Sequence, residues 1–511
     1  MNDIEQAQLS RRSVLKIGAA GAGTLVSSGS LLANSPSDIT SLTALELSSA
    51  IRSRHVSCVE VMSTFLTRID KVNPAYNAIV SRPDDSSLMA QAKACDLELS
   101  AGNYRGWMHG MPHAAKDLVD VEGMITTSGS PIFRDNVATA DALHIARIRQ
   151  AGAIFVGKTN VPEFGMGSQS YNTVFGATLN PYDGQSTAGG SSGGAAAALR
   201  LNLVPVADGS DLMGSLRNPG AYCNVIGFRP TPGLVPLSDS FIEELPCNGP
   251  MARNVSDTAM LLSTIAGYDP RYPSGIQSNP ASFAEPLKKD FKGTRIGWLG
   301  DFDGYLATEP GVLSLCERAL GSFRDIGCEV EAADPGYPMD KLWQTWLTFR
   351  HWLNRGRGSA LYENEKTRVM LKPEMIWEIE GGMKLTGDDV YRASIARSEW
   401  YRALLTAFEQ YDYLVLPTAQ LFPFSAETNW PQSINGRAMD TYHRWMEIVI
   451  MGTLSGCPVI NVPAGFSDKG LPMGLQIIAP RYHDQSALQI AYAYEQASRW
   501  NLDHDPIVKS A

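Results

Sequence analysis

The sequence predicts an α/β fold with a mostly parallel or mixed sheet, because strand patterns alternate with helix patterns along the chain. From His144, "HIARIRQAGAIFVGKTN" predicts a helix that ends at Gly152 and then a buried strand over residues 154–156. The alternation continues: "RIGWLG" and "YDYLVLPT" have the pattern of strands, and "PGVLSLCERALGSFRDIG" and "DQSALQIAYAYEQASRW" that of helices. No internal repeat or Pro-rich linker interrupts this region, so a single domain is expected over residues 34–511.

A helix signal stands near the start of this region. "SCVEVMSTFLTRIDKV" begins at Ser57 and has Glu60 three residues later, which is the spacing of a capping box. Apolar residues then recur at helical spacing and predict one buried face: Val59, Met62, Phe65, Leu66 and Ile69. An amphipathic helix is therefore expected to follow Ser57.

Composition and charge exclude several classes of protein. Hydrophobic residues make up 44% of the 511 residues and charged residues 19%, which is typical of a globular chain rather than a disordered one. The formal net charge is −10, and no basic run occurs outside the extreme N-terminus. A nucleic-acid partner is therefore not expected.

Cysteine and histidine spacing argues against a disulfide framework or a metal site. The seven cysteines are scattered singly, without a CxxC pair. His109 and His113 are separated by Gly110 and Pro112, so they cannot share a helix face as ligands. Both histidines are interpreted as loop residues, and no metal is expected.

The N-terminus has the layout of an export signal. "SRRSVLK" places Arg11 and Arg12 before "IGAAGAGTLVSSGSLLA", a weakly apolar run of small residues. The run is too short and too small-residued for a stable membrane span, which needs about 20 strongly apolar residues. We expect a twin-arginine signal over residues 1–33, with Ala33 a plausible last residue, and a periplasmic protein. The alternative is a disordered tail.

Tryptophan is concentrated in residues 337–445, which hold seven of the ten in the chain. They are Trp343, Trp346, Trp352, Trp377, Trp400, Trp430 and Trp445. For any one of them, burial in a core of packed helices is the ordinary role. The alternative is a hydrophobic substrate wall, and we expect at least one to line the site.

Two glycine–serine runs are the strongest local feature. "TAGGSSGGAAAALR" starts at Thr187, and "VADGSDLMGSLRNPG" starts at Val206. Neither has the lysine of a phosphate loop after its last glycine, and neither contains the Gly-x-Gly-x-x-Gly of a dinucleotide fold. Because "AAAALR" favours a helix, the first run predicts a tight turn at a helix N-terminus, with free backbone N–H groups.

A serine on such a turn suits acyl transfer, which requires a nucleophile beside an oxyanion hole. Asp211 and Arg217 can pair across the second turn. Neither run contains a histidine, so a neutral buried lysine is the alternative activator. Lys116 in "MPHAAKDLVD" and Lys158 in "FVGKTN" are both candidates on this reasoning, and pairing with an acid such as Asp117 is the structural alternative for either.

Six ordered motifs resemble those of the amidase signature family, over about residues 41–500. They are "MPHAAKD", "GKTNVPEFGMGSQSYNTVFGATLNPYD", "TAGGSSGGAAAA", "GSDLMGSLRNPGAYCNVIGFRPTPGLVP", "GPMARNVSDTAMLL" and "GLPMGLQIIAP". The resemblance implies a large mixed, mostly parallel twisted sheet covered by helices on both faces. It also implies a triad of Ser215 as nucleophile, Ser191 as bridging serine after a cis peptide, and Lys116 as base. Lys158 would then be structural.

One position departs from the family pattern. Met213 stands where the family usually has the first of two glycines before the nucleophile. The resemblance implies an oxyanion hole made by the backbone N–H groups of Leu212, Met213 and Gly214, with that of Ser215, so a side chain at 213 need not abolish it. Met213 is instead a candidate for shaping the substrate pocket, in favour of an apolar or aromatic amide.

These features predict an amidase that cleaves a carboxamide C–N bond through an acyl-enzyme, without a metal or an organic cofactor. The expected partner is a small-molecule amide, and a homodimer is compatible with the resemblance. Alternatives within the family are an esterase, an aryl acylamidase and the glutaminase-type component of an amidotransferase. Binding without catalysis, on an inactive hydrolase scaffold, ranks low because all three triad positions are intact.

Overall fold

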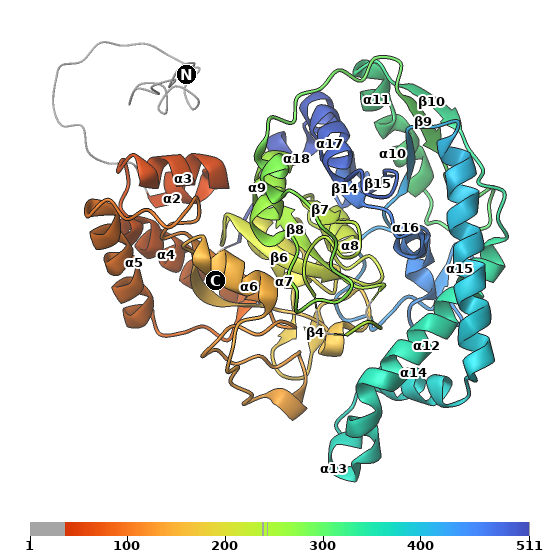
Figure 1. Cartoon of the computed structure of the whole chain (residues 1–511), viewed down its shortest axis with the longest axis horizontal. Coiled ribbons are helices and arrows are strands. Elements are labelled where there is room, and N and C mark those ends of the chain that lie inside the picture. The colour runs from red at the N-terminus through yellow and green to blue at the C-terminus, as the bar shows by residue number, and fades with distance from the viewer. Residues whose placement is uncertain (1–35, 238–239, 243, 510–511) are drawn as a thin grey trace. The chain divides into compact units, whose positions relative to one another are not determined.

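An eight-stranded mixed sheet runs through the computed structural model, which describes residues 36–237, 240–242 and 244–509 (Figure 1). The strand order is β10-β9-β11-β15-β14-β7-β8-β6. The strands are β6 (Val206–Asp211), β7 (Ile226–Arg229), β8 (Cys247–Ala252), β9 (Arg295–Trp298), β10 (Glu329–Ala332), β11 (Tyr413–Pro417), β14 (Val459–Phe466) and β15 (Pro472–Ile478). The predicted signal, residues 1–33, lies outside the described residues.

The sheet is mixed, as expected, but it is not mostly parallel. Only the pairs β10–β9 and β9–β11 are parallel, whereas β11–β15, β15–β14, β14–β7, β7–β8 and β8–β6 are antiparallel. The expectation of a mostly parallel sheet is therefore wrong. For one of these pairs the physical reason is plain: β14 and β15 form a hairpin through a short turn, which requires antiparallel pairing.

Helices cover both faces of this sheet. They include α6 (Leu143–Gln150), α7 (Gly193–Arg200), α8 (Arg217–Tyr222), α9 (Val255–Ile265), α10 (Val312–Ala319), α11 (Gly321–Asp325), α16 (Ile450–Ser455), α17 (Asp484–Ser498) and α18 (Trp500–Asp503). In β8, a Cβ on Gly249 would meet Leu216, at the start of α8, whereas the neighbouring Asn248 bonds to His144 of α6. Because successive residues of a strand face opposite sides, α6 and α8 lie on opposite faces.

A three-stranded sheet of order β1-β3-β2 lies next to the edge strand β6. Its strands are β1 (Ile79–Val80), β2 (Pro112–Lys116) and β3 (Ile154–Thr159). The helices α2 (Pro36–Ser41), α3 (Ala44–Arg52), α4 (Cys58–Tyr76) and α5 (Asp85–Ser100) belong to the same N-terminal part. The predicted capping box is present at the start of α4, where Ser57 and Glu60 bond each other's backbone N–H groups.

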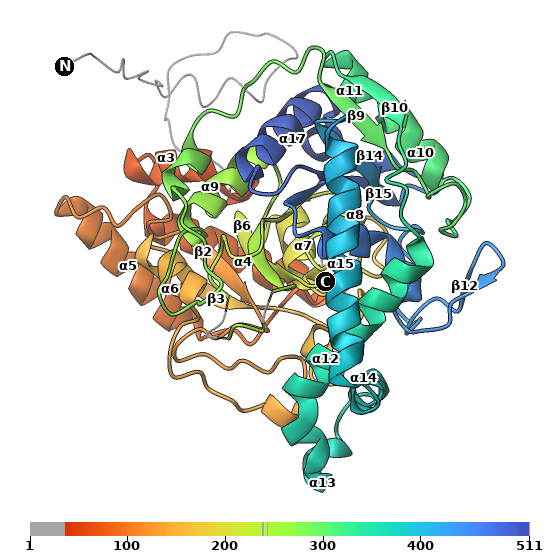
Figure 2. The same ribbon diagram turned by 45° about the vertical axis from the view of Figure 1, so that its right-hand side comes forward.

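The tryptophan-rich segment begins as four helices: α12 (Met339–Glu363), α13 (Glu365–Arg368), α14 (Pro373–Met383) and α15 (Gly387–Phe408). Figure 2 shows α15 as a long helix with α12 and α14 near its lower end, and α13 at the tip of the molecule. The helices end at Phe408, and β11 then joins the sheet. Residues 337–445 are therefore not helical throughout.

Core packing accounts for most of the tryptophans in this segment. Trp343, Trp346, Trp400 and Trp445 are at most 1% exposed. Trp352 and Trp430 are partly buried, and Trp377 is 39% exposed. The ordinary core interpretation therefore holds for four of the seven.

The remaining elements are short. They are β4 (Tyr171–Asn172), β5 (Gly176–Ala177), β12 (Ser433–Ile434), β13 (Arg437–Ala438) and the 3-10 helices η1 (Pro131–Phe133), η2 (Glu163–Gly165), η3 (Pro280–Ala284) and η4 (Arg444–Val449). From Pro36 on, the chain forms one compact unit. None of the helices in the described part is long and apolar enough to cross a bilayer.

Candidate active site

Lys116 is the last residue of β2, and its ammonium lies among serines. Its Nζ is 2.9 Å from Ser191 Oγ, 2.8 Å from Ser192 Oγ and 3.0 Å from Ser210 Oγ, and it is 3.2 Å from the Ser210 carbonyl oxygen. The side chain is fully buried. No ion pair of the described residues involves this lysine, so only hydroxyl and carbonyl oxygens hold it.

Burial lowers the pKa of Lys116 to about 7, although the carboxylates of Asp208 and Asp211 oppose the shift. An ordinary lysine is protonated at neutral pH and cannot accept a proton. A lysine with a pKa near 7 is neutral in a large fraction of molecules, and its free lone pair can serve as a base.

Asp208 on β6 connects Lys116 to two histidines. Its carboxylate accepts the Lys116 backbone N–H at 3.3 Å and lies 3.0 Å from His113 Nε2 and 3.5 Å from His144 Nε2. Burial opposes ionisation, but these imidazoles hold the pKa of Asp208 well below its usual range. His113 lies in β2, so interpreting it as a loop residue was wrong; its ring is part of a buried network.

The first glycine–serine run forms the predicted turn before a helix. Its backbone N–H groups are not free as expected, because those of Gly193 and Gly194 donate to Ser170 Oγ and to the Asn160 carbonyl oxygen, both at 3.1 Å. The Gly190–Ser191 peptide is cis, as the resemblance implies, and α7 begins at Gly193. Close packing explains the glycines, since a Cβ on Gly194 would lie 2.2 Å from the Asn160 nitrogen. The Ser192 N–H donates to the Ser215 carbonyl oxygen at 3.2 Å, so this turn and the second one are joined.

The second run is held by Asp211. Arg217 donates from Nε and Nη2 to the two carboxylate oxygens, each at 3.0 Å, which confirms the expected pair. The same carboxylate accepts the N–H groups of Gly214 at 2.9 Å and Leu216 at 3.1 Å. Ser215 therefore lies on a turn that is held by the fully buried carboxylate of Asp211.

The Asp211 contacts change the set of backbone donors near Ser215. The N–H of Gly214 points to Asp211, so in this structure it is not free to bind an oxyanion, contrary to expectation. Among the hydrogen bonds of the described residues, none starts from the N–H of Leu212, Met213 or Ser215. These three groups are therefore unoccupied by the described contacts, and their role as oxyanion donors stays a prediction.

Met213 is 3% exposed and packs within the main hydrophobic core. There is also a second, smaller cluster: its buried members are Met166, Leu371, Met375 and Ile379, with Phe164 packed against them. A Cβ on Gly165 would stand 3.4 Å from Ser191 Oγ. The loop between Phe164 and Met166 therefore joins the second cluster to the bridging serine. The pocket role of Met213 stays a prediction.

Lys158 on β3 is held by the chain around it. Its Nζ donates to the Val119 carbonyl oxygen and to Thr126 Oγ1. Burial lowers its pKa, and Asp117 is the largest opposing charge. Lys158 reaches no serine of the two runs in the described contacts, which fits a structural role.

Three side chains lie close enough together to act as metal ligands: Cys95, Glu98 and His109. Both imidazole nitrogens of His109 already have partners, since Nδ1 accepts the Arg105 N–H and Nε2 lies 2.9 Å from the Cys95 carbonyl oxygen. Glu98 is bound by the Arg105 guanidinium. The set is therefore a hydrogen-bonded structural cluster.

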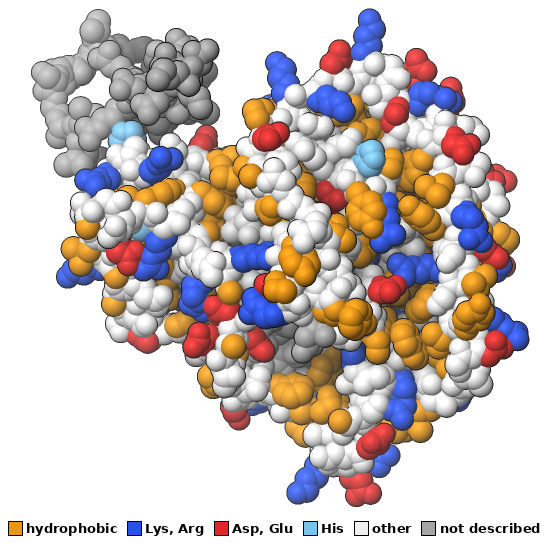
Figure 3. Space-filling model, viewed as in Figure 1, with side chains coloured by type: hydrophobic (Ala, Val, Ile, Leu, Met, Phe, Trp, Pro, Cys, Tyr) orange, Lys and Arg blue, Asp and Glu red, His pale blue; other side chains and the backbone are white. Residues whose placement is uncertain are grey.

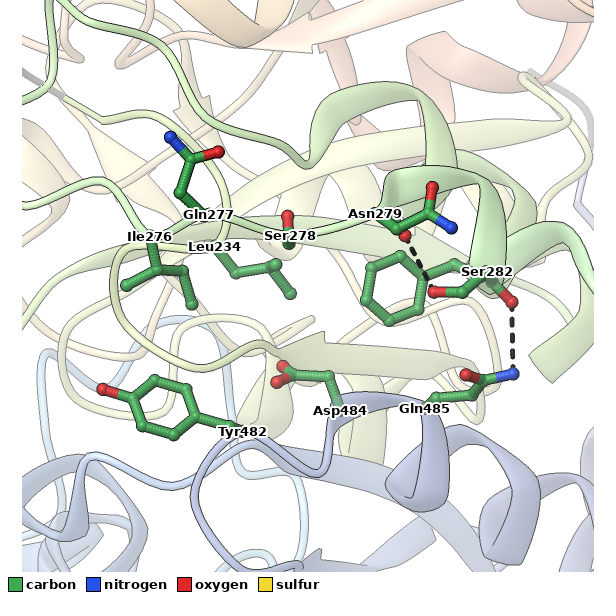
Figure 4. A pocket seen from close by; sticks show the side chains of 10 residues that line it. Leu234, Ile276, Gln277, Ser278, Asn279, Ser282, Tyr482, Asp484 and Gln485 are labelled. Atoms are coloured by element: carbon green, nitrogen blue, oxygen red, sulfur yellow. Dashed lines mark hydrogen bonds between the residues drawn. The ribbon is translucent and has the colours of Figure 1, made fainter.

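The pocket in Figure 4, of about 440 Å³, contains none of the predicted site residues. Its buried acid, Asp484, accepts the N–H of Thr231 at 2.7 Å and its Oγ1 at 2.6 Å. Asp484 is also the first residue of α17, where a carboxylate is stabilised by the helix dipole. We assign it a structural role.

Sequence reasoning missed the side chains that orient Lys116. Ser192 and Ser210 contact its Nζ, and Asp208 fixes its backbone. Both serines stand in the glycine–serine runs, beside residues that were chosen. Their position in these runs could have marked them as site residues. Which serine contacts the lysine, however, depends on how the two turns pack together.

The chain is similar to several known proteins. An acylamidase from Rhodococcus erythropolis is 35% identical over 468 residues, which cover 90% of this chain and 96% of that protein. One component of the glutamyl-tRNA(Gln) amidotransferase from Cyanothece sp. is 32% identical over 482 residues, covering 90% and 98%. The crystal structure of a bacterial aryl acylamidase of the amidase signature family superimposes with a TM-score of 0.84 at 27% identity, covering 90% and 96%.

The fold, the site and these matches define an amide hydrolase. The Amidase family profile matches residues 60–488. The chain belongs to the amidase signature family.

Proposed function

We propose that the chain hydrolyses a carboxamide through Ser215, Ser191 and Lys116. The observation that carries this proposal is the position of Lys116 Nζ, buried and 2.9 Å from Ser191 Oγ. Neutral Lys116 takes the proton of Ser191 while Ser191 takes that of Ser215, and the Ser215 oxygen attacks the amide carbonyl. The N–H groups of Leu212, Met213 and Ser215 hold the oxyanion.

The proton then returns along the same path to the leaving nitrogen, and the C–N bond breaks. Water then attacks the acyl-enzyme carbonyl and gives a proton to Ser191, while Ser191 gives its own to Lys116. The ester C–O bond breaks, and the proton returns from Lys116 through Ser191 to the Ser215 oxygen, which releases the acid and restores the Ser215 hydroxyl. Ser192 and Ser210 orient the lysine without carrying the transferred proton. No step of this path requires a cofactor.

The substrate in this proposal has an apolar or aromatic acyl or amine group. Supporting this, the second cluster places methionine, leucine and isoleucine side chains near the loop that borders Ser191. Burial of one aromatic ring can supply about 1.5–3 kcal/mol of preference over a small polar amide. Two of the compared proteins are an acylamidase and an aryl acylamidase, which supports the same preference.

An ester substrate and a glutaminase-type role are the alternatives. The second is favoured only by the likeness to the amidotransferase component. Purified enzyme assayed with an aromatic anilide, its matched ester, acetamide and glutamine separates these functions. We expect the anilide to have the highest kcat/KM among the amides; a preference for glutamine would overturn the proposed substrate class.

We propose further that the enzyme is exported by the twin-arginine route and works in the periplasm, as Arg11 and Arg12 before a small-residue run suggest. A homodimer is the proposed assembly. Light scattering on the purified chain tests it.

A further inference from the structure

A groove of about 620 Å³ lies away from the proposed triad. α12, α15 and the last turn of α16 contribute to its walls, together with Arg481. Trp352, Tyr401 and Leu405 supply apolar surface, and Leu405 is 45% exposed. Of the described residues that line it, none is Lys116, Ser191 or Ser215.

Two guanidinium groups of the groove lie near Gly456. If Gly456 carried a Cβ, that atom would lie 3.8 Å from Arg397 Nη2 and 3.9 Å from Arg481 Nε. Burial lowers the pKa of Arg397, and the charge of Arg481 contributes to the same shift. Like charges held this close favour an anion between them.

The groove lacks enough acid to balance its arginines. Its described lining includes Arg397, Arg402 and Arg481, whereas Glu244 is the one carboxylate. Glu244 Oε2 lies 3.4 Å from Arg397 Nη1, and its side chain is 66% exposed, so solvent weakens the pair. Figure 3 shows basic side chains next to hydrophobic ones on the face that α15 borders. The lining therefore combines basic and apolar side chains.

Part of Arg397 has a structural task. Its Nε donates to the Leu454 carbonyl oxygen at 3.2 Å, where α16 ends. Its terminal nitrogens are left for Glu244 and for the space beside Gly456. This arrangement fixes the guanidinium in advance, which lowers the entropy lost when a ligand binds.

We propose that this groove binds an amphipathic carboxylate, with the carboxylate between Arg397 and Arg481 and the apolar body along Trp352 and Tyr401. Arginine pairs recognise carboxylates through charge-assisted hydrogen bonds. The occupant is an apolar carboxylic acid of the kind that amide hydrolysis releases. The apolar character of this ligand rests on the proposed substrate preference, whereas its negative charge is inferred from the groove alone.

The groove is connected to the catalytic turn through α16. Gly456 follows the last turn of α16 at the groove, and Val449, just before its first turn, is so close to Gly214 that a Cβ there would meet it at 2.8 Å. α16 therefore connects the groove to the turn that contains Gly214. We expect inhibition by the acid product to have a component that is not competitive with substrate.

The test is titration calorimetry with phenylacetate and phenylacetamide, in the Ser215→Ala variant so that the amide is not hydrolysed. We expect the groove to bind phenylacetate at least about tenfold more tightly than phenylacetamide, because a neutral amide cannot form ion pairs with the two guanidinium groups. Arg481→Gln and Arg397→Gln should each weaken phenylacetate about tenfold or more. The matched control, Arg392→Gln, removes an exposed arginine of α15 paired with Asp388 and should change nothing.

Two results would overturn the proposal. One is unchanged phenylacetate affinity in both Arg481→Gln and Arg397→Gln, which would place the acid elsewhere, including the catalytic pocket. The other is no heat of binding with millimolar phenylacetate in the parent. Circular dichroism checks the fold of each variant, and Arg481→Gln decides the case if Arg397→Gln, which loses the α16 contact, is unstable. Because these assays use an inactive enzyme, their failure leaves the proposed hydrolysis standing.

Discussion

Lys372 Nζ donates to the Met166 carbonyl oxygen at 3.1 Å, which joins the start of α14 to the loop beside Ser191. Burial lowers the pKa of Lys372, although Glu374 and Glu163 oppose the shift. The ammonium also lies over the Tyr171 ring. This cation, whose side chain is 11% exposed, therefore joins the start of α14 to the loop at residues 164–166.

We predict that Lys372→Met raises KM for an aromatic anilide about tenfold, because a charge-assisted hydrogen bond of about 1.5–3 kcal/mol is lost where the pocket closes. The kcat for acetamide should stay close to that of the parent, and Lys372→Arg should restore KM in part. Lys366→Met, an exposed change on α13, is the control. An equal loss of kcat for both substrates would indicate damage to the fold instead.

Replacing the proposed triad residues should distinguish groups that transfer the proton from groups that only contact Lys116. Ser215→Ala should abolish hydrolysis, and Ser191→Ala and Lys116→Ala should each reduce kcat by about a thousandfold or more. Ser192→Ala is a matched control, because Ser192 also touches Lys116, at 2.8 Å, but lies off the proposed path. Its loss should be smaller, about tenfold. Near-normal rates in well-folded Ser215→Ala would remove that assignment.

The rate should rise with pH through the pKa of Lys116, which is about 7. Only the neutral amine is a base, so the active fraction falls as pH decreases through this value. The charge of Asp208 raises that pKa, so Asp208→Asn should move the rising limb to lower pH. The measurement is kcat/KM against pH, with a substrate for which acylation limits the rate. A flat profile across neutrality would argue against a lysine base.

Met213→Gly tests the departure from the family pattern. If Met213 shapes the pocket, the variant should lose part of its preference for an anilide over acetamide. Because Met213 is 3% exposed within the core, the same change should lower stability by about 2–5 kcal/mol, as other large-to-small core changes do. Thermal unfolding and paired kcat/KM values measure the two effects. Lower stability with an unchanged preference would limit Met213 to packing.

Export depends on the paired arginines in our proposal. Arg11→Lys with Arg12→Lys should leave the protein in the cytoplasm with residues 1–33 attached. Fractionation and intact-mass measurement of both forms check this, with the unchanged chain as reference. Unaltered periplasmic recovery of the double variant would rule out this route.

Periodicity predicted the elements that have one buried face. The helix after Ser57, the terminal helix α17 and the strand β11 all lie where the patterns placed them. Strand direction was not predictable in this way, because a buried strand has the same apolar pattern whether its neighbour is parallel or antiparallel.

The candidate site was likewise predicted from the sequence only in part. Turn chemistry predicted the turn before α7 in the first glycine–serine run, and Asp211 and Arg217 pair as expected. The occupation of the Gly214 N–H by Asp211 could not be foreseen, since it depends on which way a carboxylate turns beneath the loop. Likewise, the choice between Lys116 and Lys158 came from resemblance, because both are buried at the ends of adjacent strands.

All seven cysteines are free and buried. Burial raises the pKa of the Cys247 and Cys457 thiols to about 11 each, so little reactive thiolate exists at neutral pH. Native molecules should consequently resist an alkylating reagent, and each chain should take up label only when it opens. Mass spectrometry of pulse-labelled protein can thus follow the rate of unfolding. Chains that carry a single label indicate local opening, whereas chains labelled at all seven cysteines indicate global unfolding.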